Sequence, residues 1–351
     1  MSDILTQSRP TQSRRDFMKK IATGGVAVAG AAAIGSSLAE VAQATNLPPS
    51  DKEGLGEVKQ IRTGQLDVGY YEFGPRNGPV AILLHGFPYD VHSYVEVAPM
   101  LAGRGARVIV PYLRGHGSTR FLEKAAPRAG QQAAIGADVI DLMDALGLPK
   151  AVLAGYDWGG RAACVAAALW PERCKGLVSV NSYLIQDIAK AQAPLAPRVE
   201  WGLWYQFYFQ TERGRAGLAA NRKDIARILW ANNSPNWAFD DATFERSAAA
   251  FDNPDYVDVV IHSYRHRLGS VEGVARYATL ERRLAEQPVI HVPSITLDGA
   301  ADGVVPATDG TASAAHFGGS RVHRVVPGVG HNLPQEAPGP FAAAVWELLS
   351  A

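Results

Sequence analysis

The sequence has little cysteine and no excess of charge of either sign. Only two cysteines, Cys164 and Cys174, occur among 351 residues, too few for a disulfide framework, and we expect both to be buried free thiols. Lys plus Arg and Asp plus Glu each number 34, so the formal net charge is zero. No basic stripe or block is present, and a nucleic-acid partner is therefore not expected. The sequence also has no internal repeat and, after its N-terminal segment, no low-complexity tract.

Residues 1–44 have the pattern of a targeting segment. Ser13-Arg14-Arg15-Asp16-Phe17-Met18-Lys19 matches the twin-arginine export signal, the apolar run Ile21–Leu38 follows, and Ala42-Gln43-Ala44 is a small-x-small cleavage site. A membrane anchor is the alternative, but Gly, Ser and Thr dilute the run and weaken its affinity for lipid. We expect twin-arginine export machinery as a partner of the precursor, cleavage after Ala44, no stable membrane insertion afterwards, and a periplasmic or secreted mature chain. Residues 45–57 then indicate a linker.

The rest of the chain alternates between strand and helix patterns. Its length and its 47% hydrophobic residues suit one large α/β domain or one domain with an insertion. A hairpin is predicted at Val58–Thr63 and Leu66–Phe73. The later predicted strands are Val80–Leu84, Ala106–Pro111, Ala151–Ala154, Gly176–Val180, Ser294–Leu297 and Arg321–Val326, and the predicted helices are His92–Ala102, Gln131–Leu146, Ala162–Leu169, Asp309–His316 and Phe341–Leu349. This order predicts an α/β fold with a mostly parallel sheet covered by helices on both faces.

The alternation stops between about residues 183 and 288, where the sequence is rich in aromatic residues and helical patterns. A long helical stretch that interrupts a βα series indicates an inserted helical cap. Most of its aromatic side chains are expected to fill the cap's own small core. The predicted domains are therefore a first core part at 58–182, the cap at 183–288 and a second core part at 289–351.

The central motif is Gly155-Tyr156-Asp157-Trp158-Gly159, between an apolar strand and an Ala-rich helix. This spacing is typical of a nucleophile elbow, a sharp strand-to-helix turn that lifts one side chain clear of the sheet. Its glycines are needed because a Cβ would collide with the crowded backbone. Serine usually occupies the centre, whereas a carboxylate such as Asp157 can displace a leaving group from a saturated carbon and form an ester on the enzyme. The alternative is a Gly-flanked turn with a solvated aspartate.

An ester on Asp157 needs a base to activate water and an acid to orient that base. In this type of fold the chain order is nucleophile, acid, histidine. Among nine histidines, His331 is the expected base, because it follows the last predicted strand in the loop Gly328-Val329-Gly330-His331. Asp302, after the preceding strand, is the expected orienting acid, and Asp298 at the strand end is its rival.

An oxyanion hole must hold the charge that develops when hydroxide attacks the ester. We expect the backbone N–H groups of Phe87 and Trp158 to provide it, since one follows a buried strand and the other follows the nucleophile. Phe87 lies in His85-Gly86-Phe87-Pro88. Pro88 is expected to fix the bend, and His85 to shape the loop rather than to titrate in catalysis. Both are also candidate contacts to the substrate.

The group that stabilises the leaving group decides the substrate. An opening epoxide leaves a basic alkoxide, which needs a proton or strong hydrogen bonds, and phenol hydroxyls from a lid are suitable donors. A departing halide needs only N–H donors such as indoles. Tyrosines in the predicted cap are therefore the candidate donors for an epoxide oxygen.

Together with Arg114-Gly115-His116-Gly117-Ser118 and Gly330-His331, these motifs resemble the α/β-hydrolase superfamily, and within it the epoxide hydrolase branch, across about residues 57–350. The resemblance implies that Tyr205 and Tyr264 are ring-opening tyrosines, with Tyr208 as the fallback for Tyr205. A core aromatic residue is the alternative for each. The resemblance implies no metal and no organic cofactor, and a small-molecule substrate, either an epoxide or an organohalide.

Two positions depart from the epoxide hydrolase pattern. Tyr112 stands before Arg114-Gly115, where members of this branch usually carry aspartate. Arg161 resembles one arginine of the haloacetate dehalogenase pair that grips the substrate carboxylate, but Trp158 occupies the place of the other. We therefore expect Arg161, a candidate substrate contact, to form an ion pair at the surface or behind the site instead. Haloalkane dehalogenases share the Asp-Trp pair and use the indole for halide, so Trp158 does not discriminate.

The sequence thus predicts a hydrolase that works through an ester on Asp157 and opens epoxides to vicinal diols. A haloalkane or haloacetate dehalogenase with the same nucleophile, acid and base is the main alternative. A non-catalytic ligand-binding protein on the same scaffold is a remote one, because fold alone does not fix function.

Overall fold

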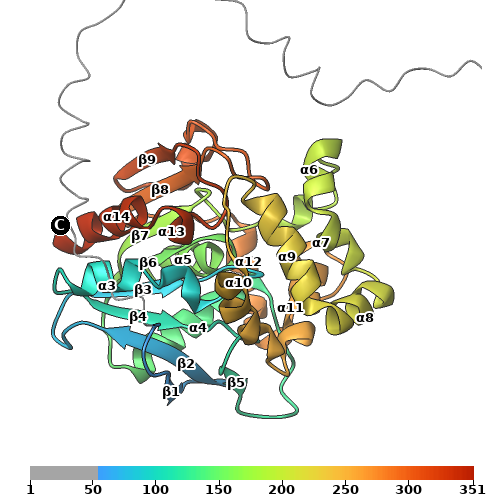
Figure 1. The fold of residues 1–351 in the computed structure, drawn as a ribbon, viewed down its shortest axis with the longest axis horizontal. Helices are drawn as coiled ribbons and strands as arrows, with labels where there is room; N and C mark the ends of the chain where they lie inside the picture. The colour runs from blue at the N-terminus through green and yellow to red at the C-terminus, as the bar shows by residue number, and fades with distance from the viewer. Residues whose placement is uncertain (1–53) are drawn as a thin grey trace, which may run out of the picture. The chain divides into compact units, whose positions relative to one another are not determined.

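The computed structural model describes residues 54–351, in which a sheet of nine strands carries helices on both faces (Figure 1). The predicted export signal, and the predicted linker up to residue 53, lie outside the described residues. Within residues 54–351, no helix combines the length and the apolar character needed to cross a membrane. Both cysteines are buried free thiols, as predicted.

The strands lie in the order β1-β2-β4-β3-β6-β7-β8-β9, and β5 pairs with β2. All pairs that involve β2 are antiparallel, and all the others are parallel, which confirms the edge hairpin and the mostly parallel sheet. The bounds are β1 (Lys59–Arg62), β2 (Leu66–Phe73), β3 (Val80–Leu84), β4 (Arg107–Pro111), β5 (Arg120–Phe121), β6 (Ala151–Gly155), β7 (Cys174–Val180), β8 (Ser294–Gly299) and β9 (Arg321–Val326).

Two strands inside the sheet are buried along their whole length, and β6 is also apolar throughout. Every residue of β6 is buried, and so is every residue of β8. Continuous apolar runs rather than alternating ones are expected of parallel strands that are covered on both faces. Because the carboxyl ends of parallel strands meet at one edge, the loops after β3, β6, β8 and β9 come together there.

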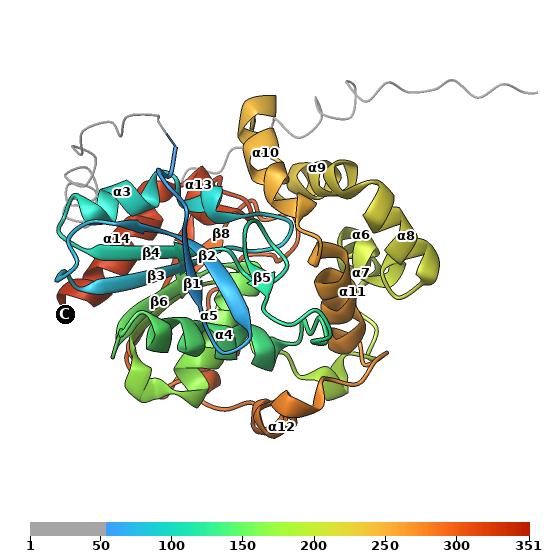
Figure 2. The same ribbon diagram turned by 90° about the horizontal axis from the view of Figure 1, so that it is seen from below.

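Two helical layers cover the sheet (Figure 2). Helices α3 (Val97–Ala102) and α14 (Pro338–Ser350) pack together on one face, and α4 (Gln132–Ala145) and α5 (Asp157–Leu169) pack together on the other. The remaining elements of the core are the helix α13 (Leu333–Glu336) and the 3-10 turns η2 (Val91–Tyr94), η3 (Pro171–Arg173) and η7 (Thr311–His316).

Between β7 and β8 the described chain forms helices and no strand. Most of these helices, α6 to α9 and α11, lie beyond one end of the sheet, on the right in Figures 1 and 2. Helix α12 instead packs against α4 and α5, so the last part of the predicted cap range joins a helical layer of the core. The elements are η4 (Ile188–Lys190), α6 (Pro197–Gly202), α7 (Trp204–Tyr208), α8 (Glu212–Ala220), α9 (Arg222–Asn233), α10 (Asp241–Ala248), η5 (Ala249–Asp252), α11 (Tyr256–Arg267), η6 (Ala275–Tyr277) and α12 (Ala278–Ala285).

Two predicted helices are wrong in extent or type. The helix expected at His92–Ala102 is split into η2 and α3, because Pro99 has no N–H to donate and fits an α-helix only in its first turn. The helix expected at Asp309–His316 is the 3-10 turn η7. There Gly310 adopts a left-handed conformation, and the Asp309 carboxylate accepts from the Thr311 amide, which offers the backbone an alternative to an α-helix.

Candidate active site

The strand β6 ends at Gly155 and the helix α5 begins at Asp157, so the turn between them is as sharp as the motif predicts. Asp157 has a φ of 49°, a strained conformation for a residue with a side chain. A Cβ on Gly159 would lie 1.9 Å from the Leu84 carbonyl oxygen of β3. Only a glycine fits this position, and the Asp157 side chain is 17% exposed, so it is not a solvated surface group.

The Asp157 carboxylate faces two candidate partners. The Phe87 amide donates to Oδ1 at 2.7 Å, and Nε2 of His331 lies 3.7 Å from Oδ2. Burial raises the pKa of Asp157, but His331 and the Phe87 amide outweigh burial and hold it below its usual value. The carboxylate is therefore ionised at neutral pH, which the predicted role as a nucleophile requires.

Asp302 lies behind His331. Its Oδ2 is 2.8 Å from Nδ1 of the imidazole and accepts from the Asn181 side-chain amide at 3.2 Å. Its Oδ1 accepts from the amides of Val304 and Val305 at 2.7 and 2.9 Å. Each oxygen of this buried carboxylate is therefore hydrogen-bonded, which fixes the orientation of the imidazole.

The rival acid, Asp298, is occupied elsewhere. Its Oδ2 accepts from the amide and the hydroxyl of Thr308, at 2.9 and 3.1 Å, and lies 3.7 Å from Nε2 of His323. The structure thus brings Asp302, and not Asp298, against His331.

The charge of His331 depends on both carboxylates. Burial alone lowers the pKa of this imidazole, but the charge of Asp302 and the interactions with Asp157 raise it to about 10. With Asp157 ionised, His331 is therefore protonated and forms an ion pair with it. If Asp157 loses its charge, one of the two carboxylates that raise the pKa of His331 no longer does so.

A network that the sequence reasoning missed holds the His331 loop. The amide of His331 donates to Oγ of Ser234 at 3.2 Å, and the Ser234 hydroxyl donates to Oε1 of Glu336 at 2.6 Å. The Gly330 amide donates to the other Glu336 oxygen at 2.7 Å. Glu336 follows the His331 loop closely, but no motif marks its partner Ser234, which belongs to the segment between β7 and β8.

The model of the family described as alpha/beta hydrolase fold matches residues 79–338, most of the described chain. The chain belongs to the alpha/beta hydrolase fold family. The predicted fold class and the prediction of an enzyme of this kind are thereby confirmed.

Several proteins similar to this α/β-hydrolase are named epoxide hydrolases. Epoxide hydrolase A of Mycobacterium tuberculosis is 28% identical over 323 residues, which cover 85% of this chain and 98% of that protein. The crystal structure of a Klebsiella pneumoniae protein with a provisional epoxide hydrolase assignment is 51% identical, with a TM-score of 0.83, and covers 86% of this chain and 100% of that one. Epoxide hydrolase A of Mycobacterium thermoresistibile shares the fold. It is 21% identical, with a TM-score of 0.68, and covers 84% of this chain and 98% of that one. These similarities place the chain in the epoxide hydrolase-like branch of the family.

Both predicted ring-opening tyrosines of this α/β-hydrolase lie in one aromatic cluster around Phe87. Tyr205 of α7 and Tyr264 of α11 are buried, with ring centres 5.3 Å apart and 6.2 and 5.4 Å from that of Phe87. Burial is the main cause that raises the pKa of each phenol. The charge of Asp157 adds to the rise at Tyr205, and Tyr205 adds to the rise at Tyr264. Both hydroxyls are therefore protonated at neutral pH and can act as hydrogen-bond donors.

Tyr208, the fallback, lies elsewhere. A Cβ on Gly217 of α8 would lie 1.9 Å from the Tyr208 hydroxyl oxygen, which places this hydroxyl against α8. Its ring packs beside those of Trp204 and Phe209. The structure therefore brings Tyr205, and not Tyr208, to the cluster around Phe87.

The indole of Trp158 makes a contact that the sequence did not predict. Its Nε1 donates to the Tyr264 hydroxyl at 3.3 Å, and its ring stacks on Phe87 with centres 5.4 Å apart. Among the hydrogen bonds of the described residues, the Asp157 carboxylate accepts from the Phe87 amide, and no bond from the Trp158 amide occurs. The expected second oxyanion donor is thus not engaged in the free protein.

Hydrogen bonds of His85 and Pro88 hold the loop after β3. Nδ1 of His85 lies 2.9 Å from the Gly86 carbonyl oxygen, and its Nε2 accepts from the Leu113 amide at 3.1 Å. Burial and His116 lower the pKa of His85 well below its ordinary value, so this imidazole is neutral. The Pro88 carbonyl accepts from the Trp230 indole at 2.7 Å, which ties the loop to α9.

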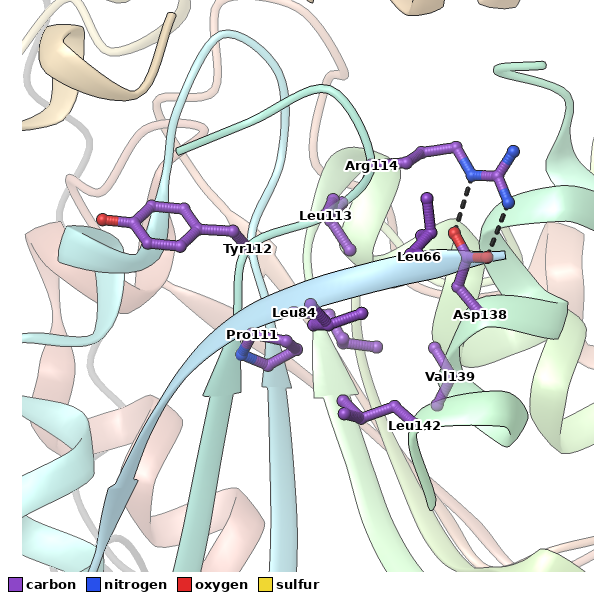
Figure 3. Close-up of a pocket in the computed structure, with 10 residues that line it drawn as sticks. Leu66, Leu84, Pro111, Tyr112, Leu113, Arg114, Asp138, Val139 and Leu142 are labelled. Carbon is purple, nitrogen blue, oxygen red and sulfur yellow. Dashed lines mark hydrogen bonds and ion pairs between the residues drawn. The ribbon is translucent and has the colours of Figure 1, made fainter. Parts of the chain in front are cut away.

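The motif that begins at Arg114 has a structural role. Nε and Nη2 of Arg114 each donate to one oxygen of Asp138 at 2.6 Å, and this bidentate pair borders a small cavity of about 20 Å³ (Figure 3). Tyr112, in place of the usual aspartate, lines the same cavity. None of the candidate catalytic residues lines this cavity.

The prediction that Arg161 forms an ion pair is wrong. Arg161 is 8% exposed, and its Nη1 donates to the Leu184 carbonyl at 2.6 Å. No carboxylate of residues 54–351 forms an ion pair with it. Arg161 is buried because the segment after β7 covers this part of α5, and a local motif does not reveal such a long-range contact.

Within the described chain, no group of three or more His, Cys, Asp or Glu side chains is placed to hold a metal ion.

Proposed function

We propose that this α/β-hydrolase opens epoxides to vicinal diols through an ester on Asp157. The observation that carries the proposal is the hydrogen bond from the Trp158 indole to the Tyr264 hydroxyl. Because the Tyr264 oxygen accepts there, its own proton is free for a different acceptor. Because the indole N–H is engaged, it is not free for a halide. The pair therefore suits an oxygen leaving group better than a halogen. The names of the relatives support the same substrate class.

In the first step, Oδ2 of Asp157 attacks one epoxide carbon, and the bond from that carbon to the ring oxygen breaks. Oδ1 stays on the Phe87 amide. The ring oxygen takes a proton from Tyr264 or Tyr205. The product of this step is a hydroxyalkyl ester of Asp157.

With the charge of Asp157 gone, the imidazolium of His331 releases a proton, and the phenolate left by ring opening takes one up. In the second step the neutral His331 takes a proton from water, and the hydroxide attacks the ester carbonyl carbon. The charge on Oδ1 is held by the Phe87 amide. The carbon–oxygen bond between the Asp157 carbonyl carbon and the substrate breaks, and the imidazolium returns its proton to the departing oxygen. The new carboxyl group of Asp157 passes its proton to His331, which regenerates the carboxylate and the imidazolium. One water is consumed and one diol is released.

Isotope labelling tests the ester directly. In a single turnover in heavy-oxygen water, the first diol should take its new oxygen from Asp157, and the label should appear in the Asp157 peptide instead. Full label in that first diol would contradict the covalent step. Halide release from haloalkanes or haloacetates, without turnover of any epoxide, would favour the dehalogenase alternative. Turnover of neither class would favour a ligand-binding protein.

We further propose that the precursor is exported by the twin-arginine route to the periplasm or beyond. The pattern around Arg14 and Arg15 supports this, and these residues lie outside the described ones. Replacing both with lysine should leave the uncleaved precursor in the cytoplasm, as measured by cell fractionation and by N-terminal sequencing. Normal export of the double variant would contradict the proposal.

A further inference from the structure

Arg161 is a buried cation that has no anionic partner among residues 54–351. It lies one helical turn after Asp157 on α5, and its Nε is buried and has no hydrogen-bond partner among residues 54–351. Its Nη1 donates to a neutral group, the Leu184 carbonyl. Buried charges in proteins are normally paired, because leaving water without compensation is costly. The missing compensation points to a group that is not part of this chain.

A second arginine contacts the same segment after β7 as Arg161 does. Arg267, the last residue of α11, holds its guanidinium carbon 5.1 Å from the ring centre of Tyr264. Its Nε donates to Oε1 of Gln186 at 2.9 Å, and the Gln186 side-chain amide donates back to the Arg267 carbonyl. Its partners are thus neutral as well, and no carboxylate within the described chain forms an ion pair with it.

The two arginines act on each other and on the nucleophile. Burial, and after it the charge of Arg267, lowers the pKa of Arg161 to about 9, and the charge of Asp157 opposes this shift. The charge of Arg267 also contributes to the low pKa of Asp157. The two guanidinium groups also bind one short segment after β7, Arg161 at the Leu184 carbonyl and Arg267 at the side chain of Gln186, two residues further on.

The charges of the site favour a monovalent anion. Asp157 and Asp302 carry negative charge, and His331, Arg161 and Arg267 carry positive charge, so these five groups sum to one positive charge. A single carboxylate neutralises it, whereas a doubly charged phosphate would leave an excess next to the nucleophile. Guanidinium groups also match the planar, two-oxygen shape of a carboxylate.

We infer that Arg161 and Arg267 form a subsite for a carboxylate of the substrate, so that this chain acts on epoxides that carry a carboxylate group. Residues four apart on a helix are about 6 Å apart along its axis, so the carboxylate lies within a few carbon atoms of the epoxide. This inference rests on the proposed function, since it names the substrate class of the same site.

Binding is tested without turnover by using butyrate as the probe and butyramide as its uncharged match. Butyrate should raise the thermal unfolding temperature of the wild-type chain, and butyramide should not. Arg161→Gln and Arg267→Gln should each abolish this rise. The matched control is Arg265→Gln, two residues before Arg267 on α11, whose side chain pairs with the exposed Glu212 and should leave the rise intact. An equal response to both probes, or an unchanged response in Arg161→Gln, would overturn the subsite.

Turnover separates the subsite from the proposed function. Oxirane-2-carboxylate should be hydrolysed with a higher kcat/KM than oxirane-2-carboxamide, and each arginine substitution should lower the value for the acid by about 10- to 100-fold, mainly through KM. The value for the amide should change less than about threefold. Equal use of acid and amide would overturn the subsite and leave epoxide hydrolysis standing. Butyrate binding without turnover of either epoxide would overturn the proposed function and leave the subsite standing. Circular dichroism establishes that each variant is folded.

Discussion

The imidazole of His331 lies between two carboxylates, with Nδ1 2.8 Å from Asp302 and Nε2 3.7 Å from Asp157. The shorter contact orients the ring, and the longer one faces the group that is proposed to react. Replacing Asp302 by Asn keeps the shape but removes the charge that supports the imidazolium. We expect hydrolysis of the Asp157 ester to slow by about 10²–10⁴. Formation of the ester should slow much less, because it needs only Asp157 and the phenols.

Rapid-quench mass spectrometry of the Asp157 peptide measures both steps. The matched control is Asp298→Asn, which alters the rival carboxylate at the end of β8 and leaves the imidazole contact intact. The same loss of ester hydrolysis in both variants would show that Asp302 has no special role.

The coupling between Asp157 and His331 predicts a pH dependence of one step only. In the free protein Asp157 is ionised, because its pKa is lowered, so ester formation should be constant between about pH 5 and pH 8. Once the ester has formed, the Asp157 charge is gone, and the pKa of His331 falls from its value of about 10. Ester hydrolysis needs the neutral imidazole, so its rate should rise with pH through this lowered pKa.

Single-turnover rates measured across that pH range test the prediction. His331→Gln should accumulate the ester at every pH, visible as added mass on the Asp157 peptide. Ester formation that falls steeply on acidification, with pH-independent hydrolysis, would reverse the proposed roles.

In wild-type protein the raised pKa of His331 also implies a contribution to the free energy of unfolding. It is fully present below about pH 6.5 and is lost as the pH rises through about 10.

The local parts of the site could be predicted from the sequence because each is a short motif with its own geometry. The elbow at Asp157, the loop of Phe87 and the loop of His331 each follow a strand of the parallel sheet, and that order already places them at one edge. The choice of Asp302 over Asp298 also follows from position, since it stands beyond the strand end.

The environment of Arg161 could not be predicted in this way. Its burial depends on the segment after β7, and its neighbour Arg267 lies more than a hundred residues further along the chain, on α11. The roles of Ser234 and Glu336 depend on the same long-range packing. Likewise, only the packed structure distinguishes Tyr205 from Tyr208, which lie on one short helix and point to different neighbours.

The two buried phenols predict how the helices between β7 and β8 contribute to the proposed ring opening. Replacing Tyr205 and Tyr264 together by Phe removes both proton donors while keeping the rings that pack on Phe87. We expect ester formation from an epoxide to slow by about 10²–10⁴. The matched control is Tyr208→Phe, which removes a hydroxyl of α7 that faces α8, and it should change the rate less than about threefold. Stopped-flow measurement of ester formation gives the comparison, and an equal loss in the control and the double variant would contradict the assignment.

The tight approach of α5 to β3 predicts a stability effect at Gly159. A Cβ there would lie 1.9 Å from the Leu84 carbonyl oxygen, which belongs to the strand that leads into the Phe87 loop. The backbone cannot yield without moving Phe87, the proposed oxyanion donor, so Gly159→Ala should destabilise the fold by at least about 1–3 kcal/mol and slow ester formation. Gly339→Ala in α14 is the matched control, since a Cβ there has no atom within 4 Å. This control should be neutral or stabilising by about 0.5–1 kcal/mol. Urea unfolding measures both, and a Gly159→Ala variant as stable and as active as Gly339→Ala would mean that the elbow does not need the close contact between its helix and β3.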